Sequence, residues 1–128
     1  MRIKGTASIV GIVTFCLAAL AFAQGQEKFG VKVYPGAQFD AATSDGVKKM
    51  LQQDAACYRT PDSVAKVNAF YKQQPNLKLM GDTPEGGMFS KGTGADMEVM
   101  VTVQSPWMDM ATGKMNKDTL VSIVNQKK

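Results

Sequence analysis

Residues 54–75, DAACYRTPDSVAKVNAFYKQQP, contain the pattern that decides the fold. Their first part is a short apolar run typical of a buried strand, and beyond it apolar residues recur at the three- and four-residue intervals of a helix. Thr60 is expected to cap that helix, Pro61 suits its first position, and Pro75 stops it. A buried strand that leads directly into an amphipathic helix predicts a sheet with a helix packed on it.

Most of the remaining chain has the two-residue apolar period of strands. The clearest example is 97–104, MEVMVTVQ, and similar short runs occur at 31–33, 77–81, 86–92 and 119–124. Helical spacing returns only at 39–53. The sequence therefore predicts an α+β fold, a curved and mostly antiparallel sheet of about five strands with two helices packed on one face.

The first 23 residues have the composition of a secretory signal peptide. Arg2 and Lys4 precede an apolar run, and a small-residue site ends at Ala23. An uncleaved anchor is the competing interpretation, but the run is short for a membrane span. Cys16 follows a phenylalanine rather than a small residue, so lipid attachment is not expected. Cleavage predicts a periplasmic or secreted protein without a membrane span.

The mature chain then divides into two parts. Residues 24–30 are predicted as a flexible N-terminus and residues 31–128 as a single α+β domain. Removing Arg2 and Lys4 from the formal charge of +4 leaves +2, and the other basic residues are scattered among acids. A nucleic-acid partner is therefore not expected.

Cleavage also leaves Cys57 as the only cysteine, so a disulfide within one chain is excluded. Its apolar surroundings favour burial as a small hydrophobic residue. The alternative is a disulfide to a second chain, which would make a homodimer.

The composition argues against an enzyme. The chain has no histidine, which excludes Ser-His-Asp and Cys-His nucleophiles and the commonest zinc ligand. Residues 112–115, TGKM, lack the Ser or Thr that follows the lysine of a phosphate loop. Carboxylate pairs such as Asp96 and Glu98 are explained more simply as charged side chains that keep the edge of a strand soluble. We predict no catalytic residue and no cofactor.

The segment 105–115, SPWMDMATGKM, combines the only tryptophan with three methionines between two predicted strands. A hairpin loop whose tryptophan closes the end of the core is the first interpretation, and a partner-binding tip is the second. Met80, Met88 and Met100 fall on the less apolar phase of their strands and predict a methionine patch on the sheet face away from the helices. The predicted binding residues are Trp107, Met108, Met110 and Met115, with Met100 as the link to the sheet.

A metal site is the third interpretation of the same segment. Thioether sulfur prefers Cu(I), and Met108 and Met110 would face the same way on an extended strand, with Met115 nearby. No histidine is available to complete such a site. Cu(I) or Ag(I) handling through these three methionines therefore remains the alternative to partner binding.

Three short motifs, YPGA at 34–37, CYRTPDS at 57–63 and FYK at 70–72, resemble those of small exported bacterial domains of unassigned function. In those domains a YPGA turn precedes a strand that ends in a Thr-x-Asp-Ser helix start. The resemblance implies a single exported domain and assigns no catalytic or binding residue. Together with the composition, it predicts a non-enzymatic binding or accessory protein of the bacterial cell envelope, whose partner is an envelope protein or an apolar ligand.

Overall fold

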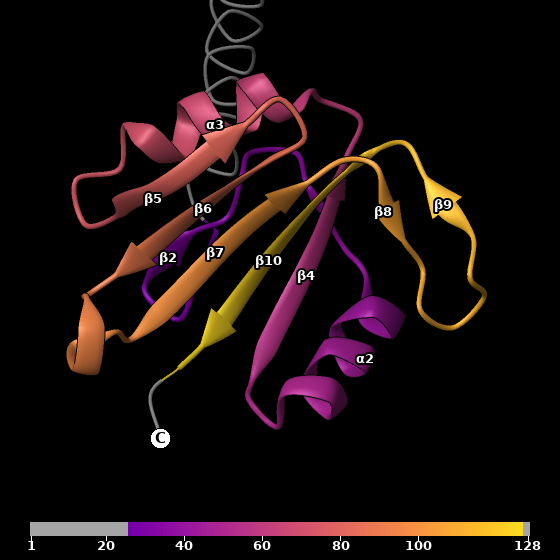
Figure 1. The fold of residues 1–128 in the computed structure, drawn as a ribbon, viewed down its shortest axis with the longest axis horizontal. Helices are drawn as coiled ribbons and strands as arrows, with labels where there is room; N and C mark the ends of the chain where they lie inside the picture. Colours follow the sequence, from indigo (N-terminus) through magenta and orange to yellow (C-terminus); the bar gives the residue numbers. More distant parts are fainter. Residues whose placement is uncertain (1–25, 127–128) are drawn as a thin grey trace, which may run out of the picture.

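The computed structural model describes residues 26–126, in which the main sheet has six antiparallel strands in the order β3-β4-β10-β7-β6-β5 (Figure 1). The predicted signal peptide, 1–23, lies outside the described residues. The strands are β3 (Gln38–Phe39), β4 (Ala55–Thr60), β5 (Lys78–Thr83), β6 (Gly86–Lys91), β7 (Val99–Gln104) and β10 (Thr119–Asn125). Two small ribbons pair β1 (Glu27–Lys28) with β2 (Val31–Lys32), and β8 (Trp107–Met108) with β9 (Met115–Asn116). The helical elements are α2 (Ala41–Leu51), α3 (Val64–Lys72) and the short 3-10 helix η1 (Gly94–Asp96).

The predicted α+β class and the mostly antiparallel sheet are confirmed, whereas the strand number is corrected from about five to six. The strand that was not predicted is β3, which is only two residues long, whereas the predicted strand at 31–33 forms β2 and pairs with β1 outside the main sheet. Phe39, predicted as the first helical residue, lies in this strand and pairs with Tyr58. A two-residue strand has no period of its own, so the sequence pattern merged it with the following helix.

Both helices begin at polar caps. The carboxylate of Asp40 accepts a hydrogen bond from the amide of Thr43 at 3.0 Å and starts α2. The predicted cap of α3 was wrong, because Thr60 remains in β4 and Ser63 accepts from the amide of Lys66 at 3.2 Å. A serine directly before the first helical turn is as good a cap as threonine, and here it is the one in position.

The prediction that the two helices pack on one face was wrong. Successive side chains of β4 point to opposite faces. Tyr58 belongs to the larger core together with Val67 of α3, whereas Cys57 packs in a smaller cluster with Val47 of α2. Because Cys57 and Tyr58 are both buried, β4 shows no alternation that could have revealed two covered faces.

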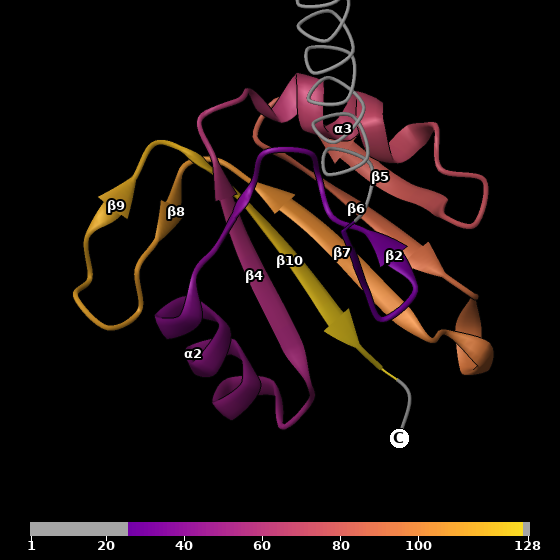
Figure 2. The ribbon, with the colours of Figure 1, turned by 180° about the vertical axis from the view of Figure 1, so that it is seen from behind.

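The N-terminal ribbon covers the same face as α3, as Figure 2 shows from behind. Val31 and Val33 are buried in the larger core, and the hydroxyl of Tyr71 donates to the carbonyl of Lys32 at 2.9 Å. Within the segment 24–30, predicted to be flexible, the structure has β1 and the turn into β2. This ribbon therefore contributes apolar side chains to the larger core on the face of α3.

The two edge strands limit pairing with other chains in different ways. β3 is very short, and β5 has a shift in register between Leu79 and Gly81. Lys72 of α3 also forms a 2.6 Å ion pair with Asp82 on this edge. Short strands, irregular register and charges are common protections of exposed edges.

In the described residues, no helix is long and apolar enough to cross a membrane.

Candidate functional site

The candidate site is the ribbon formed by β8 and β9, which we call the methionine hairpin (residues 107–116). It follows β7, leaves the main sheet and returns to it through β10 (Figure 1). Trp107 lies opposite Asn116, and Met108 lies opposite Met115. The hairpin thus brings together two methionines that are seven positions apart in the sequence.

Trp107 supports the hairpin from inside. Its side chain is only 1% exposed and packs with Cys57, Leu120 and Val47. The indole nitrogen donates a 3.0 Å hydrogen bond to the carboxylate of Asp118. The interpretation that tryptophan closes the core is confirmed, and its predicted role as a contact residue is corrected to that of an anchor, because a buried indole cannot meet a partner.

An ion-pair cluster centred on Arg59 holds the base of the hairpin. The guanidinium of Arg59 lies 4.9 Å from the centre of the Trp107 ring, and its Nε donates to Asp118 at 2.7 Å. Nη1 reaches Asp40 at 3.4 Å. The contact with Asp118, followed by that with Asp40, raises the pKa of Arg59 above its ordinary value. We call Asp40, Arg59, Trp107 and Asp118 the Arg59 cluster; it joins α2, β4 and the hairpin.

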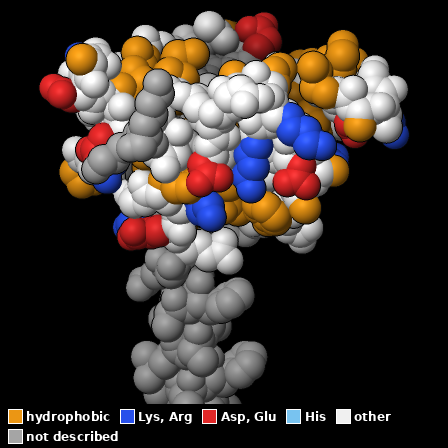
Figure 3. All heavy atoms as spheres, turned by 90° about the horizontal axis from the view of Figure 1, so that it is seen from below, with side chains coloured by type: hydrophobic (Ala, Val, Ile, Leu, Met, Phe, Trp, Pro, Cys, Tyr) orange, Lys and Arg blue, Asp and Glu red, His pale blue; other side chains and the backbone are white. Residues whose placement is uncertain are grey.

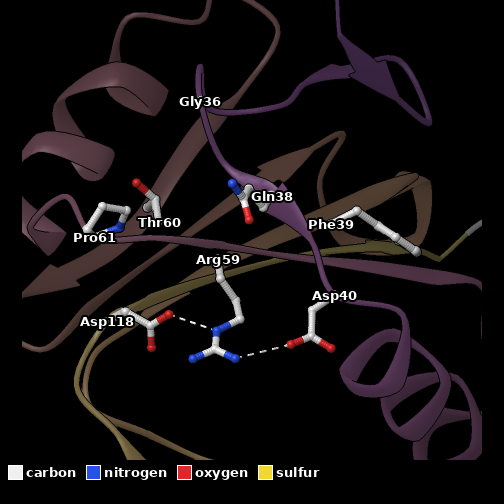
Figure 4. A pocket seen from close by; sticks show the side chains of 8 residues that line it. All are labelled: Gly36, Gln38, Phe39, Asp40, Arg59, Thr60, Pro61 and Asp118. Carbon is white, nitrogen blue, oxygen red and sulfur yellow. Dashed lines mark hydrogen bonds and ion pairs between the residues drawn. The ribbon is translucent and has the colours of Figure 1, made fainter.

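A cleft of about 420 Å³ opens beside the Arg59 cluster (Figure 4). Its charged groups are Arg59 and the two carboxylates that are bonded to it, so their polar atoms already stabilise the fold. The residues that line it are Gly36, Gln38, Phe39, Asp40, Arg59, Thr60, Pro61 and Asp118. Among the described residues, no group of three His, Cys, Asp or Glu side chains is placed to hold a metal ion. The cleft is therefore a weaker candidate for a functional site than the hairpin beside it.

The carboxylate of Asp40 gives the stability of the protein a defined dependence on pH. The amide of Thr43 and the guanidinium of Arg59 hold the pKa of Asp40 below its ordinary value of 3.8. A carboxyl whose pKa is lower in the folded state stabilises the fold fully above the unfolded pKa, and this contribution is lost as pH falls through the folded value. We expect Asp40→Asn, which keeps the capping oxygen, to unfold more easily than the natural protein at pH 7 by about 1 kcal/mol or less. Urea unfolding followed by circular dichroism measures the difference.

The same comparison at about pH 2 provides the control, because Asp40 becomes protonated as pH falls below its ordinary value of 3.8 and the difference in stability between the two proteins should then shrink. A difference that persists unchanged at this pH would show that the charge of Asp40 is not its source.

Cys57 is fully buried, as the first interpretation predicted. Its sulfur lies 3.4 Å from the hydroxyl of Ser122, and its amide donates to the hydroxyl of Ser44 at 2.8 Å. Burial raises the pKa of the Cys57 thiol. The buried sulfur argues against the alternative of a disulfide to a second chain, which remains a prediction that no observation tests.

We expect Cys57 to be unreactive toward a thiol reagent until the protein unfolds, because only an accessible thiolate attacks. The measurement uses a Cys16→Ser background, so that the counted thiol belongs to Cys57. One thiol should react rapidly in urea and none at a comparable rate in buffer. Equal rates in the two solutions would contradict the buried position.

Met108 and Met115 lie on the face of the hairpin opposite Trp107. Met108 and Met115 are 52% and 51% exposed, and Met110 is 72% exposed. Figure 3 shows hydrophobic side chains gathered at the end of the molecule where Figure 1 places this hairpin. The predicted shared orientation of Met108 and Met110 was wrong, because β8 ends at Met108 and Met110 lies in a turn. The residue that faces Met108 is Met115.

The loop of the hairpin is closed by its own hydrogen bonds. The amide of Asp109 donates to the carbonyl of Lys114 at 2.8 Å, and the amide of Gly113 donates to the carbonyl of Asp109 at 2.7 Å. The Asp109 side chain also accepts from the amide of Ala111 at 2.9 Å. Gly113 has a positive φ of 72°. Asp at the start and Gly at the end of this turn were the signals from which the Met108–Met115 pairing could have been found.

Met100 does not link the hairpin to a methionine patch. It lies on β7 opposite Ser90, and it is four positions, about 13 Å of strand, away from Gln104, where β7 ends. Met88 shares its face of the sheet and is 40% exposed. Because α2 packs against β4 on this face, the predicted face without any helix does not exist, although α2 covers only its β4 side. The methionines of the sheet and those of the hairpin are separate groups.

No protein-family model matches this chain, and the comparisons with curated proteins and with solved structures found no significant match either. The resemblance to small exported domains remains a prediction. The function must therefore be inferred from the hairpin and its surroundings.

Proposed function

We propose that this protein is an exported, non-enzymatic binding or accessory protein of the bacterial cell envelope, and that it acts through the exposed face of the methionine hairpin. The observation that carries the proposal is the contrast between the two faces of the ribbon. Trp107 is buried on one face, whereas Met108 and Met115 are half exposed on the other. The signal-like segment 1–23 supports export.

An exposed group of large apolar side chains is unfavourable in water. Such groups often mark a surface that contacts a partner or ligand. Methionine suits adaptable contact, because its unbranched side chain has several rotatable bonds and a polarisable sulfur. The hairpin is held by Trp107, the Arg59 cluster and the closed turn, so its backbone is set before any partner arrives. A prearranged surface loses less entropy on binding than a flexible one.

A non-enzymatic role is supported by the chemistry of the chain. The absence of histidine removes the commonest general base. The acidic groups beside the cleft, Asp40 and Asp118, are already bonded to Arg59. An apolar surface of an envelope protein is the partner that this face fits best.

Site-specific photo-cross-linking in the envelope of the native organism tests the proposal. A photoreactive phenylalanine at position 110 is compared with one at position 66, where exposed Lys66 lies on α3. We expect a cross-linked adduct of defined mass from position 110 and none from position 66. Equal adducts from both positions, or none from position 110, would overturn the proposal.

Substitution of Met108 and Met115 adds a chemical control. Leucine at both positions keeps apolar contact and should preserve the adduct, whereas serine at both positions should abolish it. An adduct that survives both replacements would show that this face is not the contact.

A further inference from the structure

The backbone of the methionine hairpin places two thioethers at the shortest spacing that a ribbon allows. In an antiparallel ladder, hydrogen-bonded and non-hydrogen-bonded pairs alternate. The amide of Asp109 donates to the carbonyl of Lys114, which makes the neighbouring pair, Met108 with Met115, non-hydrogen-bonded. Non-hydrogen-bonded pairs are the close ones, with Cβ atoms about 4.5–5.5 Å apart.

Both side chains leave this close pair on the same face of the ribbon, because directly opposed residues share a face. Each sulfur is two bonds beyond its Cβ, on a flexible side chain that can turn toward its neighbour. Met110 follows in the turn, two residues after Met108, and is the most exposed of the three. The hairpin can thus present two converging sulfurs and a third within reach.

Thioether sulfur is a soft, uncharged ligand that selects Cu(I) and similar ions over Zn(II), Ca(II) or Mg(II). It also binds no proton near neutral pH, unlike cysteine or histidine ligands. We infer that the methionine hairpin binds a soft monovalent ion, Cu(I) or Ag(I), through the sulfurs of Met108 and Met115, with Met110 as a third ligand. This inference rests on the proposed function, in which the same face of the hairpin is the binding surface.

The chain supplies a matched pair of methionines for comparison. Met80 and Met88 are 50% and 40% exposed, close to the values for Met108 and Met115. They lie on neighbouring strands, but the residue opposite Met88 is Gly81, because the register shifts at Met80. Exposure is therefore similar in the two pairs, whereas only the hairpin pair is directly opposed.

The test is a titration with silver nitrate in chloride-free buffer, in which the S-methyl signals of labelled methionines are followed by NMR. The full chain is used in a thiol-free background, Cys16→Ser with Cys57→Ala, so that no cysteine competes for silver. Single Met→Leu variants assign the signals. We expect the signals of Met108 and Met115 to shift and to saturate at one ion per chain, with Met110 following them.

Two variants sharpen the result. Met108→Leu with Met115→Leu should lose the binding, whereas Met80→Leu with Met88→Leu should keep it. The affinity for silver should be the same between about pH 5.5 and 7.5, because thioethers release no proton. Zinc should cause no shift of any methionine signal.

Uniform shifts of all exposed methionines, no saturable shift, or binding that the hairpin double variant retains would each overturn the metal inference. These failures are distinguishable from failure of the proposed function. If Met108→Leu with Met115→Leu still cross-links its partner from position 110, the hairpin remains a binding element, but its ligand is an apolar protein surface instead of an ion.

Discussion

Replacement of Trp107 by alanine is expected to destabilise the protein by about 3–5 kcal/mol, the usual cost of removing a large buried aromatic side chain. The indole is 1% exposed and fills the space between Cys57, Leu120 and Val47. Its loss would also remove the donor to Asp118 and the ring beneath Arg59. Because domains of this kind are stable by only about 5–15 kcal/mol, the change would remove a large share of the total.

Urea unfolding followed by far-ultraviolet circular dichroism measures this effect, since the variant has no tryptophan fluorescence. Trp107→Phe is the matched control. It keeps an aromatic ring in the cluster but loses the hydrogen bond to Asp118, and we expect a smaller cost of about 1–2 kcal/mol. If Trp107→Ala unfolds at the same urea concentration as the natural protein, packing of the indole in the smaller core does not stabilise the fold.

The local elements of the fold could be predicted from the sequence because each depends on neighbouring residues. The helical spacing of Val64, Val67 and Tyr71 predicts α3, and the alternation of the valines in 97–104 predicts β7. The turn at Pro35–Gly36 was likewise predictable, and it has the expected hydrogen bond from the amide of Ala37 to the carbonyl of Tyr34, at 3.1 Å. These patterns need no information from distant parts of the chain.

The arrangement of those elements could not be predicted, because it depends on strands that are buried on both faces. Six of the seven residues of β10 are buried, so its sequence shows no apolar alternation that could tell its two faces apart. The position of α2 against Cys57, opposite α3, is therefore invisible in the residue pattern. The prediction that both helices pack on one face of the sheet was wrong for this reason.

The candidate site was predicted in composition and missed in geometry. The segment 105–115 contains the methionines, but their pairing depends on where the chain turns. The Arg59 cluster had no signal at all, since Asp40, Arg59 and Asp118 are far apart in the chain. They meet only because β4 pairs with β3 on one side and with β10 on the other.

Gly86 is the second position at which a small change should have a large effect. A Cβ atom added there would clash with the carbonyl oxygen of Val103, far inside normal contact. Val103 lies on β7, which is paired with β6 on one side and β10 on the other, so this carbonyl cannot easily move. We expect Gly86→Ala to destabilise the protein by about 1–3 kcal/mol or more, as overpacking does in well-packed interiors.

Gly81→Ala on the neighbouring strand β5 is the matched control, because a Cβ added there meets no atom within 4 Å. Alanine restricts the unfolded chain more than glycine does, so this variant should be more stable than the natural protein by about 0.5–1 kcal/mol. Urea unfolding should thus give changes of opposite sign for the same added methyl group on adjacent strands. Two changes of equal sign and size would mean that the close approach of β6 to the carbonyl of Val103 does not set the cost. The signs of the two changes in unfolding free energy therefore test how closely β6 packs against β7. The chain continues from β7 into the methionine hairpin.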